Sequence, residues 1–292
     1  MIDGPMSAFA HVTAVRAYPD TIDVLFRRAV DRQERNRLHS LNGGRVRVVR
    51  RTAGHALLRF QQPSDRVLAE LASLDQRSLI DIRTDVSVDF LTKTSGRAEE
   101  VASALDNSVV LIGGSPTNAE PYLGTSYWAN GKGLARNLVL YADRPSKTGL
   151  GHCAHLELRF LRSASVRSAG LSLEALRGEI DILGLLRKYT RLIVIDRVKE
   201  ARRMDWLAAN NLRRFAQRRH AIGGLEQVRG DLKCLFCRMT QTAEGIPSSL
   251  AEVRGHEYWH RLPMLRNAIV RVPWEAVVPS VTWSLLNVPP TD

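Results

Sequence analysis

Two tyrosines lie close in sequence to a group of acidic residues, and this combination suggests phosphodiester chemistry. Tyr141 ends the segment LARNLVLY (134–141), and Tyr127 lies one expected strand earlier in TSYW (125–128). A tyrosine phenolate can attack a phosphodiester and become attached to the 5′ phosphate. Because the free phenol has a pKa of about 10, it needs a nearby metal ion or basic group. The alternative is that each is an ordinary half-buried tyrosine at a strand end.

The acidic residues follow the alternation of a β-strand. In LIDIRTDVSVDF (79–90), a period of two puts Asp81, Arg83, Asp85 and Asp89 on one face and apolar residues on the other. Aspartate is uncommon in strands, and three on one face repel one another unless a positive charge lies nearby. Mg²⁺, Mn²⁺ or a cluster of basic residues would supply that charge. An ordinary half-exposed strand is the alternative.

A second strand, HLELRF (155–160), could bring another carboxylate to the same place. His155, Glu157 and Arg159 share one face of it, whereas the leucines face a core. If the two strands are neighbours, the carboxylates could hold one metal ion and the arginines could hold a phosphate. The expected metal ligands are Asp85, Asp89 and Glu157, and the expected phosphate contacts are Arg83 and Arg159. The alternative is a salt-bridge ladder in which Glu157 lies between the two arginines.

The charge of the chain favours a polyanionic partner. The 292 residues include 42 Lys and Arg against 30 Asp and Glu, which gives a net charge of +12 and a pI of about 10.2. Only six of the basic residues are Lys, so 36 are Arg. Arginine binds phosphate as a fork and stacks on bases, which favours a polyanionic partner, most simply nucleic acid. A GC-rich genome would explain the preference for Arg over Lys but not the net charge.

Composition also excludes several classes of protein. Hydrophobic residues make up 44% of the chain and charged residues 25%, as in globular proteins. No apolar run approaches the roughly 18 residues of a membrane helix, and the N-terminus has no signal-peptide pattern. Three cysteines, an odd and small number, argue against a disulfide framework. We therefore expect a cytoplasmic protein without a membrane partner.

The pattern of elements predicts an α+β fold with a mostly antiparallel central sheet and helices packed on it. Residues 1–163 would form this DNA-binding and nicking domain, and 164–292 a helix-rich C-terminal region. Pro19-Asp20 predicts a turn, residues 45–61 a hairpin with one arginine-coated face, and Ser64 the N-cap of a helix over 65–74. Residues 161–172 are expected to be a polar junction. Residues 192–195 could continue a helix or interrupt it.

Further basic residues are candidate DNA contacts. The segment ARRMDWLAANNLRRFAQRRH (201–220) has helical spacing with arginines on several faces, which fits either a DNA-contacting helix or a solvated basic helix. Lysines and an arginine also accompany the tyrosine strands. The candidates are Lys132, Arg136, Lys147, Arg213, Arg214 and Arg218.

A possible zinc pattern lies near the C-terminus. Cys234, Cys237, His256 and His260 are a suitable tetrahedral ligand set. The eighteen residues between the two pairs exceed the roughly 12 of a compact finger, and apolar neighbours suggest buried cysteines. We therefore do not expect zinc at these positions.

Four short motifs together resemble a known family. They are Arg83, Asp85 and Asp89; TSYW (125–128); Arg136 to Tyr141; and LELR (156–159). This arrangement is similar to the replication initiation factor family of rolling-circle plasmids and phages, the Rep_trans type, over about residues 79–162. The resemblance implies an endonuclease that nicks one strand at an origin, with a tyrosine nucleophile and a divalent metal ion.

The resemblance also implies partners and leaves alternatives open. An origin-binding initiator would work with a host helicase or polymerase and could be a homodimer. The family continues its tyrosine strand with Asp or Asn and then Lys, whereas this chain reads Tyr141-Ala142-Asp143. A non-catalytic, sequence-specific DNA-binding replication or regulatory protein on the same fold is therefore the alternative. An RNA-binding or zinc-dependent accessory protein is a third possibility.

Overall fold

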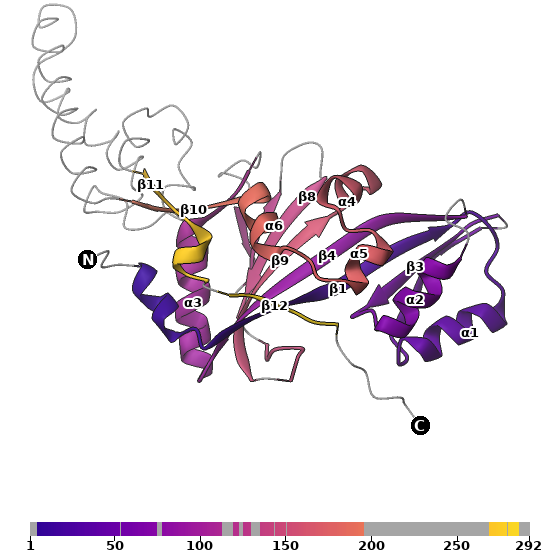
Figure 1. The fold of residues 1–292 in the computed structure, drawn as a ribbon, viewed down its shortest axis with the longest axis horizontal. Helices are drawn as coiled ribbons and strands as arrows, with labels where there is room; N and C mark the ends of the chain where they lie inside the picture. Colours follow the sequence, from indigo (N-terminus) through magenta and orange to yellow (C-terminus); the bar gives the residue numbers. More distant parts are fainter. Residues whose placement is uncertain are drawn as a thin grey trace, which may run out of the picture.

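The computed structural model confirms the α+β class and the mostly antiparallel sheet (Figure 1). It describes residues 5–52, 54–74, 78–112, 119–122, 125–129, 135–142, 144–149, 151–195, 269–278 and 280–285. None of the described helices is long and apolar enough to cross a membrane.

The main sheet has the strand order β2-β3-β1-β4-β9-β8-β7-β6, and β12 also pairs with β1. All of its pairings are antiparallel except β1 with β12. The strands are β1 Ala14–Phe26, β2 Val46–Arg51, β3 Ala56–Gln61, β4 Leu79–Thr92, β6 Ala119–Tyr122, β7 Thr125–Ala129, β8 Arg136–Tyr141, β9 His152–Phe160 and β12 Thr282–Trp283. A smaller sheet has the order β11-β10-β5, with β5 Val109–Leu111, β10 Thr190–Ile195 and β11 Ile269–Val272.

Helices cover the apolar face of the main sheet. They are η1 Pro5–His11, α1 Arg32–Leu41, α2 Asp65–Ser73, α3 Ser95–Ser108, α4 Ser163–Ala169, α5 Leu173–Arg177, α6 Ile182–Tyr189 and η5 Trp274–Ala276. Ser64 caps α2 by accepting a hydrogen bond from the Val67 N–H at 3.2 Å, as expected. The predicted junction at 161–172 instead contains α4, and residues 192–195 belong to the strand β10.

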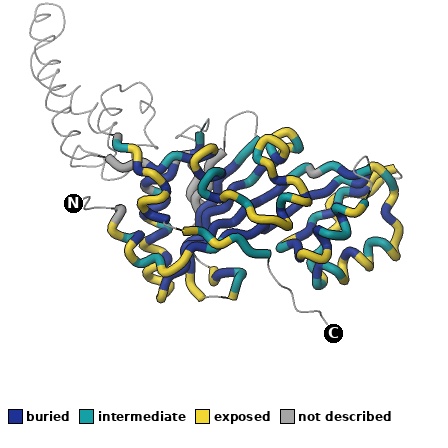
Figure 2. The backbone as a smooth tube through the Cα atoms, viewed as in Figure 1, coloured by how far each residue is buried: buried dark blue, intermediate teal, exposed yellow. Residues whose placement is uncertain are grey.

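One hydrophobic core joins the sheet to these helices. Its largest fully buried side chains include Phe60, Phe90 and Phe160, which come from three strands of the main sheet. Figure 2 shows buried residues running along the central strands. Leu173 of α5 and Trp274 of η5 belong to the same core, so described residues on both sides of position 163 pack together. The domain boundary between 163 and 164 stays a prediction.

The turn predicted at Pro19-Asp20 is wrong. β1 runs through Pro19 as one strand of 13 residues and pairs with β4 along almost its whole length. Proline has no N–H to donate and is tolerated in sheets mainly at edges or bulges. Here the pairing register shifts between Pro19 and Thr21, so the proline lies beside an irregularity that accommodates it. The consequence is that Asp20 and Thr21 lie in the middle of the sheet.

Candidate functional site

The two acidic strands are neighbours, as the candidate site requires. β4 pairs with β9 in a register that sets Asp85 opposite Arg159 and Asp89 opposite His155. Glu157 lies opposite Ser87 on the same pair of strands. Directly opposite residues point to the same side of a sheet, so these side chains share the polar face, away from the hydrophobic core.

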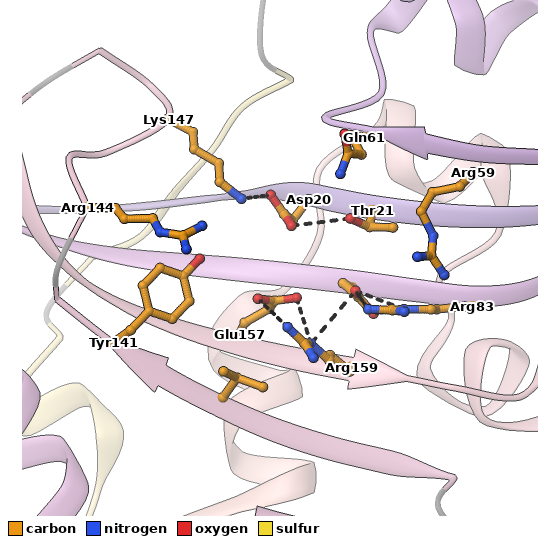
Figure 3. Close-up of a pocket in the computed structure, with 12 residues that line it drawn as sticks. Asp20, Thr21, Arg59, Gln61, Arg83, Tyr141, Arg144, Lys147, Glu157 and Arg159 are labelled. Carbon is orange, nitrogen blue, oxygen red and sulfur yellow. Dashed lines mark hydrogen bonds and ion pairs between the residues drawn. The ribbon is translucent and has the colours of Figure 1, made fainter. Parts of the chain in front are cut away.

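A cavity of about 340 Å³ lies on this polar face (Figure 3). Its charged lining residues comprise five cations and three carboxylates, and all of these come from β1, β3, β4 and β9 or from the segment after β8. The lining residues are Asp20, Thr21, Arg59, Gln61, Arg83, Asp85, Val139, Tyr141, Arg144, Lys147, Glu157 and Arg159. The excess of positive charge suits an anionic ligand such as a phosphate group.

The carboxylates in the cavity are held by arginines. Arg83 Nε lies 2.8 and 2.9 Å from the two carboxylate oxygens of Asp85. Arg159 Nε donates to Glu157 Oε1 at 2.9 Å and lies 3.9 Å from Asp85 Oδ2. The salt-bridge ladder given above as the alternative to a metal site is therefore present in part. Glu157 pairs with Arg159 as expected, but Arg83 contacts Asp85 and not Glu157. Lys147 forms an ion pair with Asp20, and both residues line the cavity.

The two buried carboxyl groups have different pKa values. Burial raises the pKa of Asp85 to about 7, and the charge of Glu157 adds to this, although Arg83 opposes it. Burial also raises the pKa of Glu157, but the hydrogen bond and charge of Arg159 outweigh it, so this pKa lies below its usual value. Asp85 is thus the group that can exchange a proton near neutral pH, while Glu157 stays ionised.

Tyr141 lines the cavity from the end of β8. Its ring stacks on His155 with centroids 4.5 Å apart, and only 9% of the residue is exposed. The guanidinium of Arg144 lies 5.9 Å from the ring centroid. Burial, followed by the charge of Glu157, raises the pKa of the Tyr141 phenol above its ordinary value. The hydroxyl is therefore protonated at neutral pH unless a cation or a base acts on it.

Asp89 lies apart from the cavity in a buried hydrogen-bond network. Its carboxylate accepts hydrogen bonds from the Tyr18 hydroxyl at 3.1 Å and the Ser146 hydroxyl at 2.7 Å. His155 Nδ1 lies 2.7 Å from the same carboxylate, and His155 Nε2 lies 3.1 Å from Cys153 Sγ. Asp89, Cys153 and His155 form a group of possible metal ligands within 4.8 Å of one another. The structure thus brings Asp85 and Glu157 together in the cavity and Asp89 into a different group.

The remaining predicted residues have varied positions. Tyr127 lies on β7 opposite Val139, but its side chain is outside what the structure describes. The Arg136 guanidinium lies 4.9 Å from the ring centroid of Tyr189, and Arg136 does not line the cavity. The other predicted residues lie outside the described residues, and they are Lys132, Arg213, Arg214, Arg218, Cys234, Cys237, His256 and His260.

Sequence reasoning missed the contribution of β1 and β3 to the site. The sequence predicts a turn at Pro19-Asp20 and places Arg59 in a basic hairpin, but it does not predict that either segment reaches the site. Thr21 lies opposite Asp85 on one side and Gln61 on the other, which brings all three strands to the cavity. The pattern in TIDVLF (21–26) indicates a possible strand, but it does not show that the strand already begins at Ala14 and runs through Pro19 and Asp20.

The residues of the cavity fit a hard divalent cation by their chemistry. Asp85 and Glu157 offer carboxylate oxygens, the ligands that Mg²⁺ and Mn²⁺ prefer. The charge of Glu157 contributes to the raised pKa of Asp85, and a cation between the two groups would relieve that repulsion. Asp89 is not among the residues that line this cavity.

Comparisons with known proteins give no family for the chain. No protein-family model matches it, and no curated protein is significantly similar to it.

Proposed function

We propose that the protein is a DNA replication initiator that binds an origin and nicks one strand through Tyr141. One observation carries the proposal: Tyr141, Asp85 and Glu157 line one cavity together with five cationic side chains. A tyrosine hydroxyl beside two carboxylates and several phosphate-binding groups is the set that a tyrosine-dependent transesterification needs. The net charge of +12 supports a DNA partner.

The proposed reaction exchanges one ester bond for another. The Tyr141 hydroxyl oxygen attacks the scissile phosphorus, and its proton passes to water. The bond between phosphorus and the 3′ oxygen breaks, and the departing oxygen takes a proton from water. Asp85 and Glu157 carry neither proton, because both carboxylates must be ionised to hold a divalent cation. The DNA is left with a 3′ hydroxyl and a 5′ phosphate bonded to the tyrosine.

The cations of the cavity stabilise the charge that develops on the phosphoryl group. Arg83 and Arg159 lie at the two carboxylates and can contact the non-bridging oxygens. A divalent cation held by Asp85 and Glu157 would supply further positive charge at these oxygens.

The experiment is a covalent-adduct assay with matched variants. A supercoiled plasmid carrying DNA that flanks the coding sequence is incubated with the full chain and Mg²⁺ or Mn²⁺. We expect metal-dependent relaxation and a protein–DNA adduct that survives denaturation, both abolished in Tyr141→Phe. Tyr189→Phe, a buried tyrosine outside the cavity, is the control. Adduct formation by Tyr141→Phe at the wild-type level would refute the assignment of the nucleophile.

A second function, DNA binding without cleavage, has its own supporting observation. The Tyr141 phenol has a raised pKa, and both carboxylates of the cavity already form arginine ion pairs. A protein of this kind would recruit host enzymes to an origin or regulate a promoter. It would bind DNA in a salt-dependent way with no cleavage at any metal concentration.

A further inference from the structure

The segment from the first half of α1 to the start of α2 is unusually basic. Residues 35–64 contain seven arginines and no Asp or Glu, and they include the whole β2–β3 hairpin. The arginines are Arg35, Arg37, Arg45, Arg47, Arg50, Arg51 and Arg59. Such a local excess of one charge is the electrostatic pattern of a polyanion-binding surface.

The pairing register shows which of these arginines face the cavity side of the sheet. Arg47 lies opposite Arg59, and Arg50 lies opposite Leu57. Leu58 is buried in the hydrophobic core, so the adjacent positions on β3 point to the other face. Arg59 also lines the cavity, which confirms this orientation (Figure 3). Arg47 and Arg50 therefore extend the polar face to the edge of the sheet.

A transverse row of side chains connects the cavity to that edge. Asp23 lies opposite Arg59 on one side and opposite Arg83 on the other. Arg47 continues the row on β2. With neighbouring strands about 4.8 Å apart, the path from β4 to β2 is roughly 14 Å long. One DNA strand advances 3.4 Å per nucleotide along a duplex, so the row matches about four nucleotides.

Arg47, at the outer end of the row, and Arg50 on the same strand carry charge that no carboxylate of the described residues neutralises. Arg59 is paired with Asp23 at 2.7 Å, and Arg83 is paired with Asp85. In contrast, Arg47 and Arg50 are exposed and form no ion pair with any carboxylate in the described part of the chain. Within the described residues, β2 is also the terminal strand of the sheet, so no further strand covers its outer edge.

We propose that the β2–β3 hairpin binds the phosphate backbone of a DNA strand that leaves the cavity and crosses the sheet toward β2. Arg47 and Arg50 are the phosphate contacts at the outer end of this track. The proposal rests on the DNA-binding part of the proposed function and does not require the nicking step. Arginine suits the role because its planar guanidinium forms two hydrogen bonds to one phosphate.

The test measures the salt dependence of DNA binding by the full chain. Fluorescent oligonucleotides of about 20 nucleotides, single-stranded and duplex, are titrated between 50 and 200 mM salt. We expect the double variant Arg47→Gln/Arg50→Gln to lower the salt slope by about 1.4 for a single strand or 1.8 for a duplex. The loss of affinity across this salt range then becomes about seven- to twelvefold smaller than in the wild type.

The control removes the same amount of charge at two positions away from the polar face of the hairpin. Arg51 lies opposite the buried Ala56, so it faces the core side, and Arg66 is exposed on α2. We expect Arg51→Gln/Arg66→Gln to keep nearly the wild-type salt slope, because Arg51 faces the core side and Arg66 lies on α2. Equal slopes for the two double variants would overturn the proposal. A wild-type chain that binds neither form of DNA would also overturn it. The same holds if Arg47→Gln/Arg50→Gln weakens the binding of polyglutamate as much as it weakens the binding of DNA.

The outcome is independent of the test of nicking. If the wild type forms no covalent adduct but the hairpin variant shows the reduced slope, the nicking proposal fails and the DNA track stands. If the adduct forms and the hairpin variant keeps the wild-type slope, the DNA track fails and nicking stands.

Discussion

At the scale of single residues, Asp85 is the group most sensitive to its surroundings. It is fully buried, with Arg83 on one side and the ionised Glu157 nearby, and its pKa is raised to about 7. An unfolded aspartate titrates near pH 3.9. Between these values the folded state binds a proton that the unfolded state lacks, so this group makes stability fall as the pH rises from about 4 to 7.

Asp85→Asn should remove this pH dependence. We expect the free energy of unfolding of the variant, minus that of the wild type, to increase as the pH rises from about 4 to 7, because only the wild type must ionise a buried carboxyl. Urea unfolding at several pH values in this window measures the difference. Glu99→Gln, at an exposed position on α3, controls for the loss of a carboxylate. A difference that stays constant across the window would contradict the assignment.

Tyr18 tests the buried network around Asp89. The Tyr18 hydroxyl donates to the Asp89 carboxylate, and both residues have no exposed surface. Tyr18→Phe should lower the free energy of unfolding by about 1–3 kcal/mol, because a buried carboxylate loses a donor. Tyr189→Phe should cost less, since its hydroxyl lies 3.5 Å from Ser168 Oγ. Chemical denaturation measures both variants. If Tyr18→Phe and Tyr189→Phe lower the free energy of unfolding equally, the hydrogen bond from Tyr18 to Asp89 does not have the expected stabilising effect.

Residue-level expectations succeeded where a strand pattern was enough. Alternation placed Asp85 and Asp89 on one face of β4 and Glu157 on the matching face of β9, and both strands exist and pair. The alternation could not show that the Asp89 carboxylate accepts hydrogen bonds from Tyr18 and Ser146. Those contacts depend on a strand and a loop 71 and 57 residues away in sequence.

At the scale of elements, the connection between α1 and the β2–β3 hairpin depends on one buried side chain. Asn42 follows α1 and donates from Nδ2 to the Arg45 and Gln61 carbonyls at 3.0 and 3.1 Å. Its Oδ1 accepts from the Ser64 N–H at 2.9 Å. A single amide therefore ties together a helix end, both hairpin strands and the start of α2.

Asn42→Ala should lower the free energy of unfolding by about 3 kcal/mol, because three backbone groups lose their hydrogen bonds to this buried side chain. Asn36→Ala, at an exposed position on the same helix, should change it by less than about 0.5 kcal/mol. Chemical denaturation of both variants provides the comparison. A loss for Asn42→Ala no larger than that for Asn36→Ala would show that the hairpin is held in place by other contacts.

Element boundaries could be predicted where local signals are strong. The Ser64 cap and the hairpin strands were identified from residues close in sequence. β1 was not, because proline and aspartate favour a turn locally, and only pairing with β4 and β3 keeps the chain extended there. β10 was left undecided, since it pairs with β11, which lies some eighty residues later.

At the scale of the whole molecule, the main sheet, with nine strands among the described residues, separates two kinds of surface. One face packs against helices in the hydrophobic core. The other face carries the cavity and, at its edge, the exposed arginines Arg47 and Arg50 of the hairpin. The pattern of elements along the sequence predicted the α+β class, but it could not predict the strand order. That order places β3 and β1 beside β4, which is why Arg59 and Asp20 reach the site.

The central claim is that Tyr141 becomes covalently bonded to DNA, and peptide mapping of the adduct tests it most directly. The full chain is incubated with supercoiled plasmid and Mn²⁺, the DNA is digested, and the protein is cleaved and analysed by mass spectrometry. We expect a nucleotide phosphate on the peptide containing Tyr141 and none in Tyr141→Phe. A nucleotide on the peptide containing Tyr127, or no modified peptide from a DNA-relaxing preparation, would contradict it.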